Sequence, residues 1–451
     1  MNGPPLEELA QRVIRLALEA RATDAECTAV EGDEFSVNVR KGEIENLKQA
    51  GSRSVGLRVL MGARTGSAYT SDLSAEGLHQ VVRSAVELAS ITTEDPHAGL
   101  PEPGELGSAG GDLQLYSGDV AALAPEDRIA MARDAETAAL CFDPRISNSE
   151  GAAFDAHTGL RVFANSRGFL GSYRSSRCSL SVIPVARDGE SMERDFWYTA
   201  SRRAAALDPP AEVGRIAAQR ALRRLNPRKI TTRKAPVVFE AQAARSLLGH
   251  LFEAVSGDSV YRQASFLAGR LGQKIASEKL TVVDDGTLPC LFGSAPFDAE
   301  GTPTRRTVVV ENGVLLHYLL NVYTGRKLGR ATTGNASRGL TGNAHVGHHN
   351  LFAEPGATPA SQIIGRLRAG LLVTELIGFG FNVVTGDYSR GAAGLWIENG
   401  EIAYPVSEIT IAGNLRTMLE NIEAVGDDLE FRGPIACPTL LIGEMTLGGT
   451  A

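Results

Sequence analysis

The chain of 451 residues lacks any run of about 18 uncharged apolar residues, so it offers no segment that could span a membrane as a helix. Its first residues, MNGPPLEELAQRV, form an acidic-to-neutral amphipathic pattern rather than a signal peptide. The five cysteines are widely scattered and form no C-x-x-C pair. This argues against a disulfide framework or a cysteine-rich zinc site and favours reduced thiols. We therefore expect a cytoplasmic protein without a membrane span.

Basic residues are also scarce. The chain has 45 Lys and Arg against 53 Asp and Glu, which gives a net charge of −8. No Lys/Arg-rich stripe is present to neutralise phosphates, so direct binding of nucleic acid is not expected. No G-x-S-x-G motif appears, and no cysteine has a local histidine or cation that would activate it as a nucleophile. The length is typical of two to three domains.

The first half of the chain has an order of elements that occurs twice. Apolar residues at helical spacing predict four helices, and alternating segments between them predict strands. We expect four short strands within residues 25–61 and four within 146–185. A Pro- and Gly-rich segment, residues 92–111, separates the two sets. The pattern therefore predicts a duplicated α+β unit, with domains at 1–110 and 111–228. The expected helices cover residues 4–22, 75–89, 125–140 and 211–225.

The last part of the chain, residues 229–451, is predicted to be a separate β-rich domain. It opens with a strand and a helix over 241–255, followed by short strands with Gly, Asn and Asp between them. Glu311-Asn312-Gly313 and Glu398-Asn399-Gly400 are strong hairpin signals. Further helices are expected at 358–368 and 411–421. The predicted fold class is thus α+β, with a barrel-like C-terminal domain that carries helices on its outside.

Residues 247–258 (LLGHLFEAVSGD) carry the most informative pattern, because they contain one histidine and no second one. A helix-borne hydrolytic zinc site usually has two histidines one turn apart, with a glutamate beside the first as base. This helix offers only His250 and Glu253. They could begin a metal site on one helix face. The simpler interpretation is that His250 is a partly buried helix residue and that Glu253 pairs with Arg262 or Arg245.

Other candidate residues are weaker. His345, His348 and His349 form the densest histidine cluster, but adventitious metal binding is the simpler interpretation because no carboxylate or thiolate completes the set locally, apart from a glutamate at 354. Asp298 and Glu300 could supply oxygen ligands or shape a substrate cleft, although turn chemistry also explains them. Tyr388 and Trp396, with a phenylalanine at 381, could line a surface that adds an unfolded peptide as a strand. Ordinary core packing explains these aromatics equally well.

Several segments together resemble one family, the TldD/PmbA proteins. Residues 39–46 (VRKGEIEN), 56–59 (GLRV) and 66–71 (GSAYTS) are similar to the N-terminal domain of that family. Further segments look like its PmbA (TldE) branch and extend the resemblance over nearly the whole chain. These are residues 253–262 (EAVSGDSVYR), 266–272 (FLAGRLG), 298–303 (DAEGTP), 323–327 (YTGRK), 385–394 (TGDYSRGAAG) and 397–401 (IENGE).

The resemblance implies a role in a two-chain peptidase. TldD-type chains carry an H-E-x-x-x-H motif and a late cysteine that bind a catalytic zinc, whereas TldE-type chains lack them and pair with a TldD-type chain. Such complexes degrade flexible peptides and remove leader peptides during maturation. Here the motif glutamate matches Glu253, while Phe252 and Gly257 stand at the two histidine positions. Cys437 lies several residues beyond the expected cysteine, so no metal ligand is carried over to this chain.

Three functions are consistent with the sequence. The first is a metal-free subunit that pairs with a zinc-bearing TldD-like partner and holds unfolded peptide. The second is an active homodimeric metallopeptidase whose site uses His250, Glu253 and the histidines at 345–349. The third is a peptide-binding or regulatory scaffold without a peptidase partner, and the acidic charge makes direct DNA contact by such a scaffold unexpected.

Overall fold

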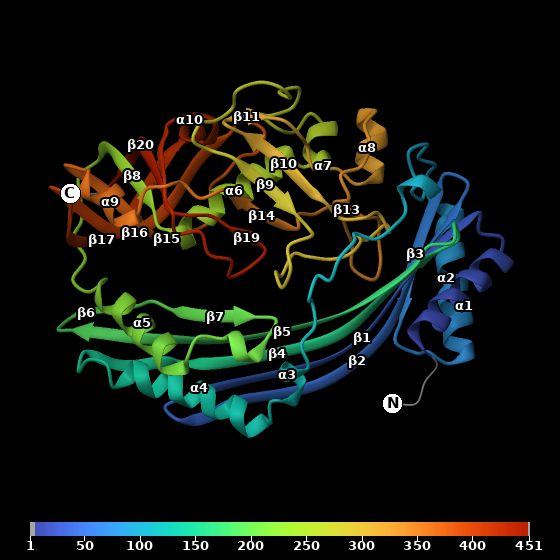
Figure 1. The fold of residues 1–451 in the computed structure, drawn as a ribbon, viewed down its shortest axis with the longest axis horizontal. Helices are drawn as coiled ribbons and strands as arrows, with labels where there is room; N and C mark the ends of the chain where they lie inside the picture. The colour runs from blue at the N-terminus through green and yellow to red at the C-terminus, as the bar shows by residue number, and fades with distance from the viewer. Residues whose placement is uncertain (1–4, 450–451) are drawn as a thin grey trace.

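The computed structural model describes residues 5–449. A long, arched antiparallel sheet forms one side of the molecule, and the C-terminal domain lies over its concave face (Figure 1). The sheet has the order β3-β2-β1-β4-β5-β6, and β7 also pairs with β5. Its strands are β1 (Asp24–Arg40), β2 (Glu43–Met61), β3 (Arg64–Thr70), β4 (Ile146–Asn165), β5 (Leu170–Asp188), β6 (Ser191–Arg194) and β7 (Trp197–Ser201).

Two pairs of helices pack on the sheet and bury two separate apolar cores. Helices α1 (Leu6–Glu19) and α2 (Ala75–Ile91) cover the ends of β1 and β2. Helices α4 (Pro125–Leu140) and α5 (Pro210–Leu222) cover β4, β5 and the far end of β1, next to the short helix α3 (Gly118–Ala122). Each half therefore contributes strands flanked by two helices, as the sequence predicts. The strands of both halves nevertheless form one continuous sheet, because β1 pairs with β4.

The structure corrects the predicted strand boundaries. The eight short strands expected in residues 25–61 and 146–185 are four long ones, β1, β2, β4 and β5. The sequence pattern suggested breaks at glycines that lie inside the strands. Gly32 pairs with Gly159, and Gly51 pairs with Asp33. A Cβ on Gly32 would lie 2.9 Å from the carbonyl oxygen of Thr158. These glycines therefore allow neighbouring strands to approach closely and do not form turns.

The C-terminal domain contains the expected barrel. Five strands close on themselves in the order β17-β16-β15-β8-β20, because β17 also pairs with β20. They are β8 (Arg233–Phe239), β15 (Ala369–Ile377), β16 (Asp387–Glu398), β17 (Glu401–Asn414) and β20 (Leu440–Gly448). The short strand β18 (Ile422–Val425) pairs with β20. The predicted turn at Asn399-Gly400 joins β16 to β17, and both residues have positive φ angles of 51° and 84°.

A second sheet of five short strands lies beside the barrel in the order β11-β10-β9-β14-β19. Its strands are β9 (Val282–Asp285), β10 (Arg306–Glu311), β11 (Val314–Leu315), β14 (Asn350–Ala353) and β19 (Ile435–Ala436). A two-strand ladder joins β12 (Ala336–Ser337) to β13 (His345–Val346). The helices of this domain are α6 (Ala241–Val255), α7 (Gly257–Tyr261), α8 (Val322–Leu328), α9 (Ala360–Gly365) and α10 (Leu415–Glu420).

Two predicted helices are shorter than expected. The helix expected at 358–368 is α9, and the helix expected at 411–421 is α10, because β17 extends to Asn414. Ile409 and Ile411 alternate into the barrel core as strand residues, and the Asn414 side chain then accepts a hydrogen bond from the Arg416 amide to cap α10. Within the described part of the chain, no helix combines the length and apolar character that crossing a membrane requires.

Candidate functional site

Helix α6 forms as predicted and places its apolar face in the core of the C-terminal domain. His250 lies on the other side, with its ring 4.5 Å from the Phe381 ring and 5.9 Å from the Tyr388 ring, centroid to centroid. Neither ring nitrogen of His250 has a hydrogen-bond partner within residues 5–449. Burial, with the nearby charge of Arg390, lowers the pKa of His250 to about 4. The imidazole is therefore neutral at pH 7.

Glu253 does not make the ion pairs that the sequence suggested. Arg245 donates to the hydroxyl of Tyr198, and Arg262 donates to the hydroxyl of Tyr261. The neutral ring of His250 lies near Glu253, with 4.0 Å between Nδ1 and Glu253 Oε1. Partial burial raises the pKa of Glu253. The two candidates thus share one helix face, as expected, but no third His, Cys, Asp or Glu of the described residues joins them to hold a metal ion.

The positions that would carry zinc-binding histidines have other roles. The Phe252 ring packs against His348, with 4.9 Å between centroids. Helix α6 ends at Val255, and Gly257 begins α7, where an added Cβ would lie 2.5 Å from Thr324 Oγ1. Cys437 is buried, and burial raises its thiol pKa. Within residues 5–449, no three His, Cys, Asp or Glu side chains are placed to hold one metal ion. The donor set does not fit a catalytic zinc.

The three clustered histidines have different surroundings. His345 is exposed on β13. His348 Nδ1 lies 3.0 Å from the carbonyl oxygen of His349. His349 is buried: its amide donates to Asp284, and its Nε2 lies 2.7 Å from the carbonyl oxygen of Gly334. His349 therefore supports the loops around it, and the cluster does not converge on a common point.

Tyr388 and Trp396 lie in the barrel core and do not line a cleft. Their residues are 2% and 3% exposed, because both occupy inward-facing positions of β16. The guanidinium of Arg233 lies over the Trp396 ring at 5.2 Å. These positions correct the predicted peptide-binding role and agree with the core-packing interpretation.

Asp298 and Glu300 lie together in a buried loop, but they have different surroundings. Asp298 accepts hydrogen bonds from the amides of Glu300, Thr302 and Ala336, so it fixes the loop as turn chemistry predicts. Glu300 accepts from the Val322 amide at the start of α8. Burial and the nearby Asp298 raise the pKa of Glu300 to about 8.

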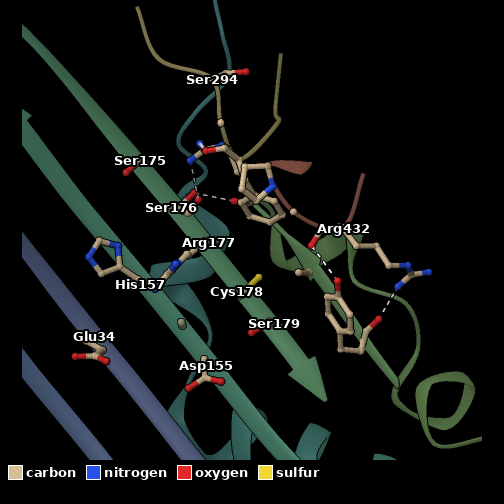
Figure 2. A pocket seen from close by; sticks show the side chains of 18 of the residues that line it. Glu34, Asp155, His157, Ser175, Ser176, Arg177, Cys178, Ser179, Ser294 and Arg432 are labelled. Carbon is tan, nitrogen blue, oxygen red and sulfur yellow. Dashed lines mark hydrogen bonds between the residues drawn. The ribbon is translucent and has the colours of Figure 1, made fainter. Parts of the chain in front are cut away.

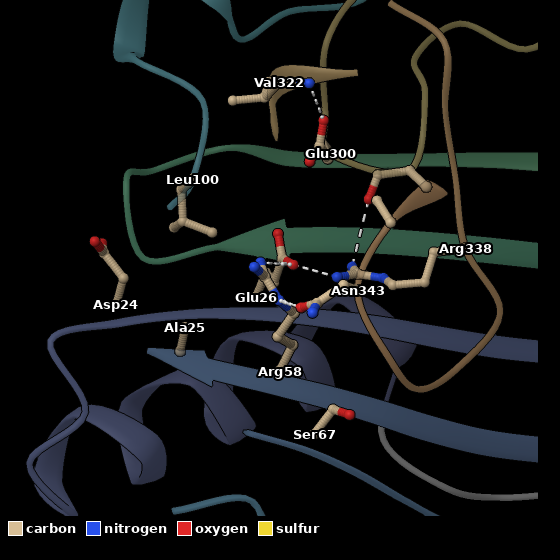
Figure 3. Close-up of polar contacts among 12 residues, drawn as sticks. Asp24, Ala25, Glu26, Arg58, Ser67, Leu100, Glu300, Val322, Arg338 and Asn343 are labelled. Carbon is tan, nitrogen blue, oxygen red and sulfur yellow. Dashed lines mark hydrogen bonds and ion pairs between the residues drawn. The ribbon is translucent and has the colours of Figure 1, made fainter. Parts of the chain in front are cut away.

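Glu300 also lines a cavity of about 480 Å³ where the N-terminal and C-terminal domains meet, opposite Arg58. A buried ion-pair network crosses this junction, as Figure 3 shows. Glu26 on β1 accepts from Arg58 on β2 at 2.7 Å and from Arg338 of the C-terminal domain. Arg58 also donates to Asn343 at 2.9 Å. Burial disfavours the Glu26 carboxylate, but the two arginines outweigh it and hold its pKa below the usual value.

A larger cleft lies elsewhere, between the concave face of the long sheet and the C-terminal domain (Figure 2). Its volume is about 760 Å³, within the range of ligand sites. On β5, alternate residues from Cys178 onward enter the core under α4 and α5. On the other face of β5, Tyr173, Ser175, Arg177 and Ser179 line the cleft.

The facing wall of the cleft comes from two loops of the C-terminal domain, residues 292–295 and 432–434. Arg432 is anchored there by Asp208 and Glu430 and by a bond to the carbonyl oxygen of Tyr198. Sequence reasoning missed this cleft because its walls are far apart in the chain. The polar alternation of β5 was visible, but it indicated only a solvated sheet face.

The arched two-part sheet, the barrel domain and helix α6 define a three-domain chain of the PmbA/TldA metallopeptidase class. Three family descriptions match in sequence: PmbA/TldA metallopeptidase domain 1 at residues 25–89, the central domain at 118–225 and the C-terminal domain at 232–449. The chain belongs to the PmbA/TldD family.

Relatives span nearly the same length. The chain is 41% identical to "Metalloprotease PmbA" of Escherichia coli O157:H7 and 40% identical to a PmbA homolog of Haemophilus influenzae, covering 98% of this chain and 96% of the relative in each case. A solved structure from Bacteroides thetaiotaomicron, named as a proposed modulator of DNA gyrase, superposes with a TM-score of 0.92 at 29% identity over the full length of both chains. TldE from Thermococcus kodakarensis, at 24% identity and a TM-score of 0.89 over 98% of this chain and 100% of that one, shares the fold.

Proposed function

We propose that this chain is a TldE-type subunit without a catalytic zinc of its own, and that it assembles with a TldD-type chain that carries the metal. The observation that carries this proposal is the state of helix α6. The helix keeps its place in the core, yet Phe252 and Gly257 stand where ligands would be and pack against neighbouring side chains. A zinc site needs three or four donors converging on one point.

The remaining donors support the same reading. Both ring nitrogens of His250 are buried beside aromatic rings, and the thiol of Cys437 is held protonated by burial. A metal ligand must be a thiolate, a carboxylate or an accessible imidazole nitrogen, so neither residue is prepared for the task. The domain has a large apolar core of its own, and its folding does not require a metal.

The cleft suggests what this chain contributes to the complex. A space of about 760 Å³ between a polar sheet face and two loops suits a short extended segment of peptide. The chain would hold the substrate in an extended form and help to enclose it, while the partner performs the cleavage. Such a subunit would act in degrading unfolded peptides or removing leader peptides. Free thiols at all five cysteines are consistent with a cytoplasmic location, which we also propose.

Reconstitution tests this proposal. The purified chain is mixed with a TldD-type chain from the same genome, and cleavage of a flexible reporter peptide is followed with and without chelator. We expect a stable complex that cleaves, no cleavage by this chain alone, and unchanged cleavage when His250→Phe and Glu253→Gln are introduced here. Chelator-sensitive cleavage by this chain alone would contradict the proposal.

A second candidate is an active homodimeric metallopeptidase, which the name metalloprotease of the relatives at 41% and 40% identity favours. In that case His250→Phe would abolish cleavage by this chain alone. A chain that binds peptide but never associates with a TldD-type chain would instead be a peptide-binding scaffold.

A further inference from the structure

One arginine in the cleft forms no ion pair with any carboxylate among residues 5–449. Arg177 points from β5 into the cleft, beside His157 of β4 and in register with it. Two carboxylates lie on the same sheet face, but neither forms an ion pair with Arg177. Glu34 accepts from Lys48 at 2.9 Å, and Asp155 accepts from Ser36 at 2.7 Å. Across residues 5–449, Arg177 itself makes no hydrogen bond or ion pair, although its charge acts on His157 and Glu34.

A second arginine of the cleft has no carboxylate partner among the described residues either. Arg202 is 6% exposed and lines the same cleft. In the described part of the chain its guanidinium donates only to backbone carbonyl oxygens, among them those of Leu291 and Phe292 at 3.0 Å each. Carbonyl dipoles satisfy its hydrogen bonds but do not cancel its charge. Arg177 and Arg202 also act electrostatically on each other.

His157 adds no charge to the cleft. Burial, with the charge of Arg177, lowers the pKa of this histidine, so its ring is neutral at pH 7. Within residues 5–449, the sheet wall of the cleft therefore holds two arginines that form no ion pair, although the carboxylates Glu34 and Asp155 lie on the same wall. A guanidinium with free N–H groups in a partly enclosed cleft is well suited to bind a carboxylate.

We propose that this cleft recognises a carboxylate of the bound peptide through Arg177, with Arg202 strengthening the local positive potential. The inference rests on the proposed peptide-holding role and specifies the substrate class further. The carboxylate could be an acidic side chain or the free C-terminus of the peptide, since both present the same group to the guanidinium.

Fluorescence polarisation with labelled eight-residue peptides tests the proposal on the full-length chain, alone and in the complex. The peptides carry Asp or Asn at the centre and end in a free acid or an amide. A single exposed charge-assisted contact should favour the carboxylate-bearing peptide by roughly five- to tenfold. Preference for Asp identifies a side chain as the source, and preference for the free acid identifies the C-terminus.

Variants of Arg177 decide the assignment. Arg177→Ala should abolish the preference, Arg177→Lys should retain part of it, and higher salt should weaken it in the wild type. Arg174→Ala is the matched control, because Arg174 is three residues away on the opposite face of β5 and stacks on Tyr116. Equal affinity for all four peptides, or a preference that survives Arg177→Ala, would overturn the inference.

The two proposals fail in different ways. If the complex forms and cleaves but shows no carboxylate preference, only this inference is wrong. If the preference depends on Arg177 but no TldD-type chain associates, the two-chain proposal is wrong and the carboxylate site stands. If neither the chain nor the complex binds any of the peptides, the cleft is not a peptide site, and the inference is refuted.

Discussion

Replacing Glu300 by Gln should change how the stability of this protein depends on pH. Glu300 is 5% exposed, and its pKa is raised from 4.5 to about 8 by burial and by Asp298. The folded state keeps a proton that the unfolded chain releases above about pH 4.5. This carboxyl therefore contributes its full stability below about pH 4.5, and that contribution is lost as the pH rises towards 8.

The size of this effect follows from the two pKa values. A rise from 4.5 to about 8, at about 1.4 kcal/mol per pH unit, sets an upper bound of about 5 kcal/mol on the stability lost between those pH values. We expect a measured loss of about 2–5 kcal/mol, because water and small movements relax buried charges. The variant Glu300→Gln keeps an acceptor for the Val322 amide and cannot ionise. Its stability should fall much less over the same range.

Guanidinium unfolding followed by tryptophan fluorescence at pH 5, 6.5 and 8 measures the effect, since Trp197 and Trp396 report on the central and C-terminal domains. Glu76→Gln is a matched control, because the Glu76 side chain is 82% exposed on α2. The Glu300→Gln variant should gain on the wild type as the pH rises, and the control should not. Parallel pH curves for wild type and Glu300→Gln would refute the reasoning.

Three further predictions concern the domain junction and helix α6. Glu26→Gln should lower the free energy of unfolding by about 3–5 kcal/mol in denaturant titrations, because Arg58 and Arg338 would stay buried without their shared carboxylate. An effect below about 1 kcal/mol would contradict this. Gly56→Ala should lower the free energy of unfolding by about 3 kcal/mol or more and lower the thermal midpoint, since its Cβ would lie 1.8 Å from the Leu340 carbonyl oxygen. The control Gly104→Ala should leave the thermal midpoint unchanged, because no atom lies within 4 Å of its added Cβ. His250→Phe should leave stability equal or raise it by up to about 2 kcal/mol in the same titrations, because it removes two unpaired ring nitrogens, and a clear loss would reveal a missed partner.

Local patterns predicted much of the fold. Helical spacing located α6 at residues 241–255, and the Asn-Gly pairs located two hairpins correctly, because these signals depend on a few neighbouring residues. The strand boundaries failed at Gly32 and Gly51, since a glycine that allows close approach of strands looks the same in sequence as one that forms a turn. Only the partner strands distinguish the two cases.

The candidate site was harder to predict because most of it is assembled by tertiary contacts. The absence of a second histidine near His250 was visible in the sequence. The surroundings of Glu300 were not, because Glu26 and Arg58 come from strands more than two hundred residues away in the chain. Tyr388 could be a cleft or a core residue until the closure of the barrel decided the matter. The cleft at Arg177 likewise requires two loops of another domain.

The metal content of the chain purified alone tests the central claim most directly. Elemental analysis is carried out on protein without a histidine tag, after dialysis against metal-free buffer. The account predicts less than about a tenth of an equivalent of zinc, because no described group of side chains offers a complete donor set. Close to one equivalent that survives dialysis would contradict the account and would make this chain a metallopeptidase in its own right.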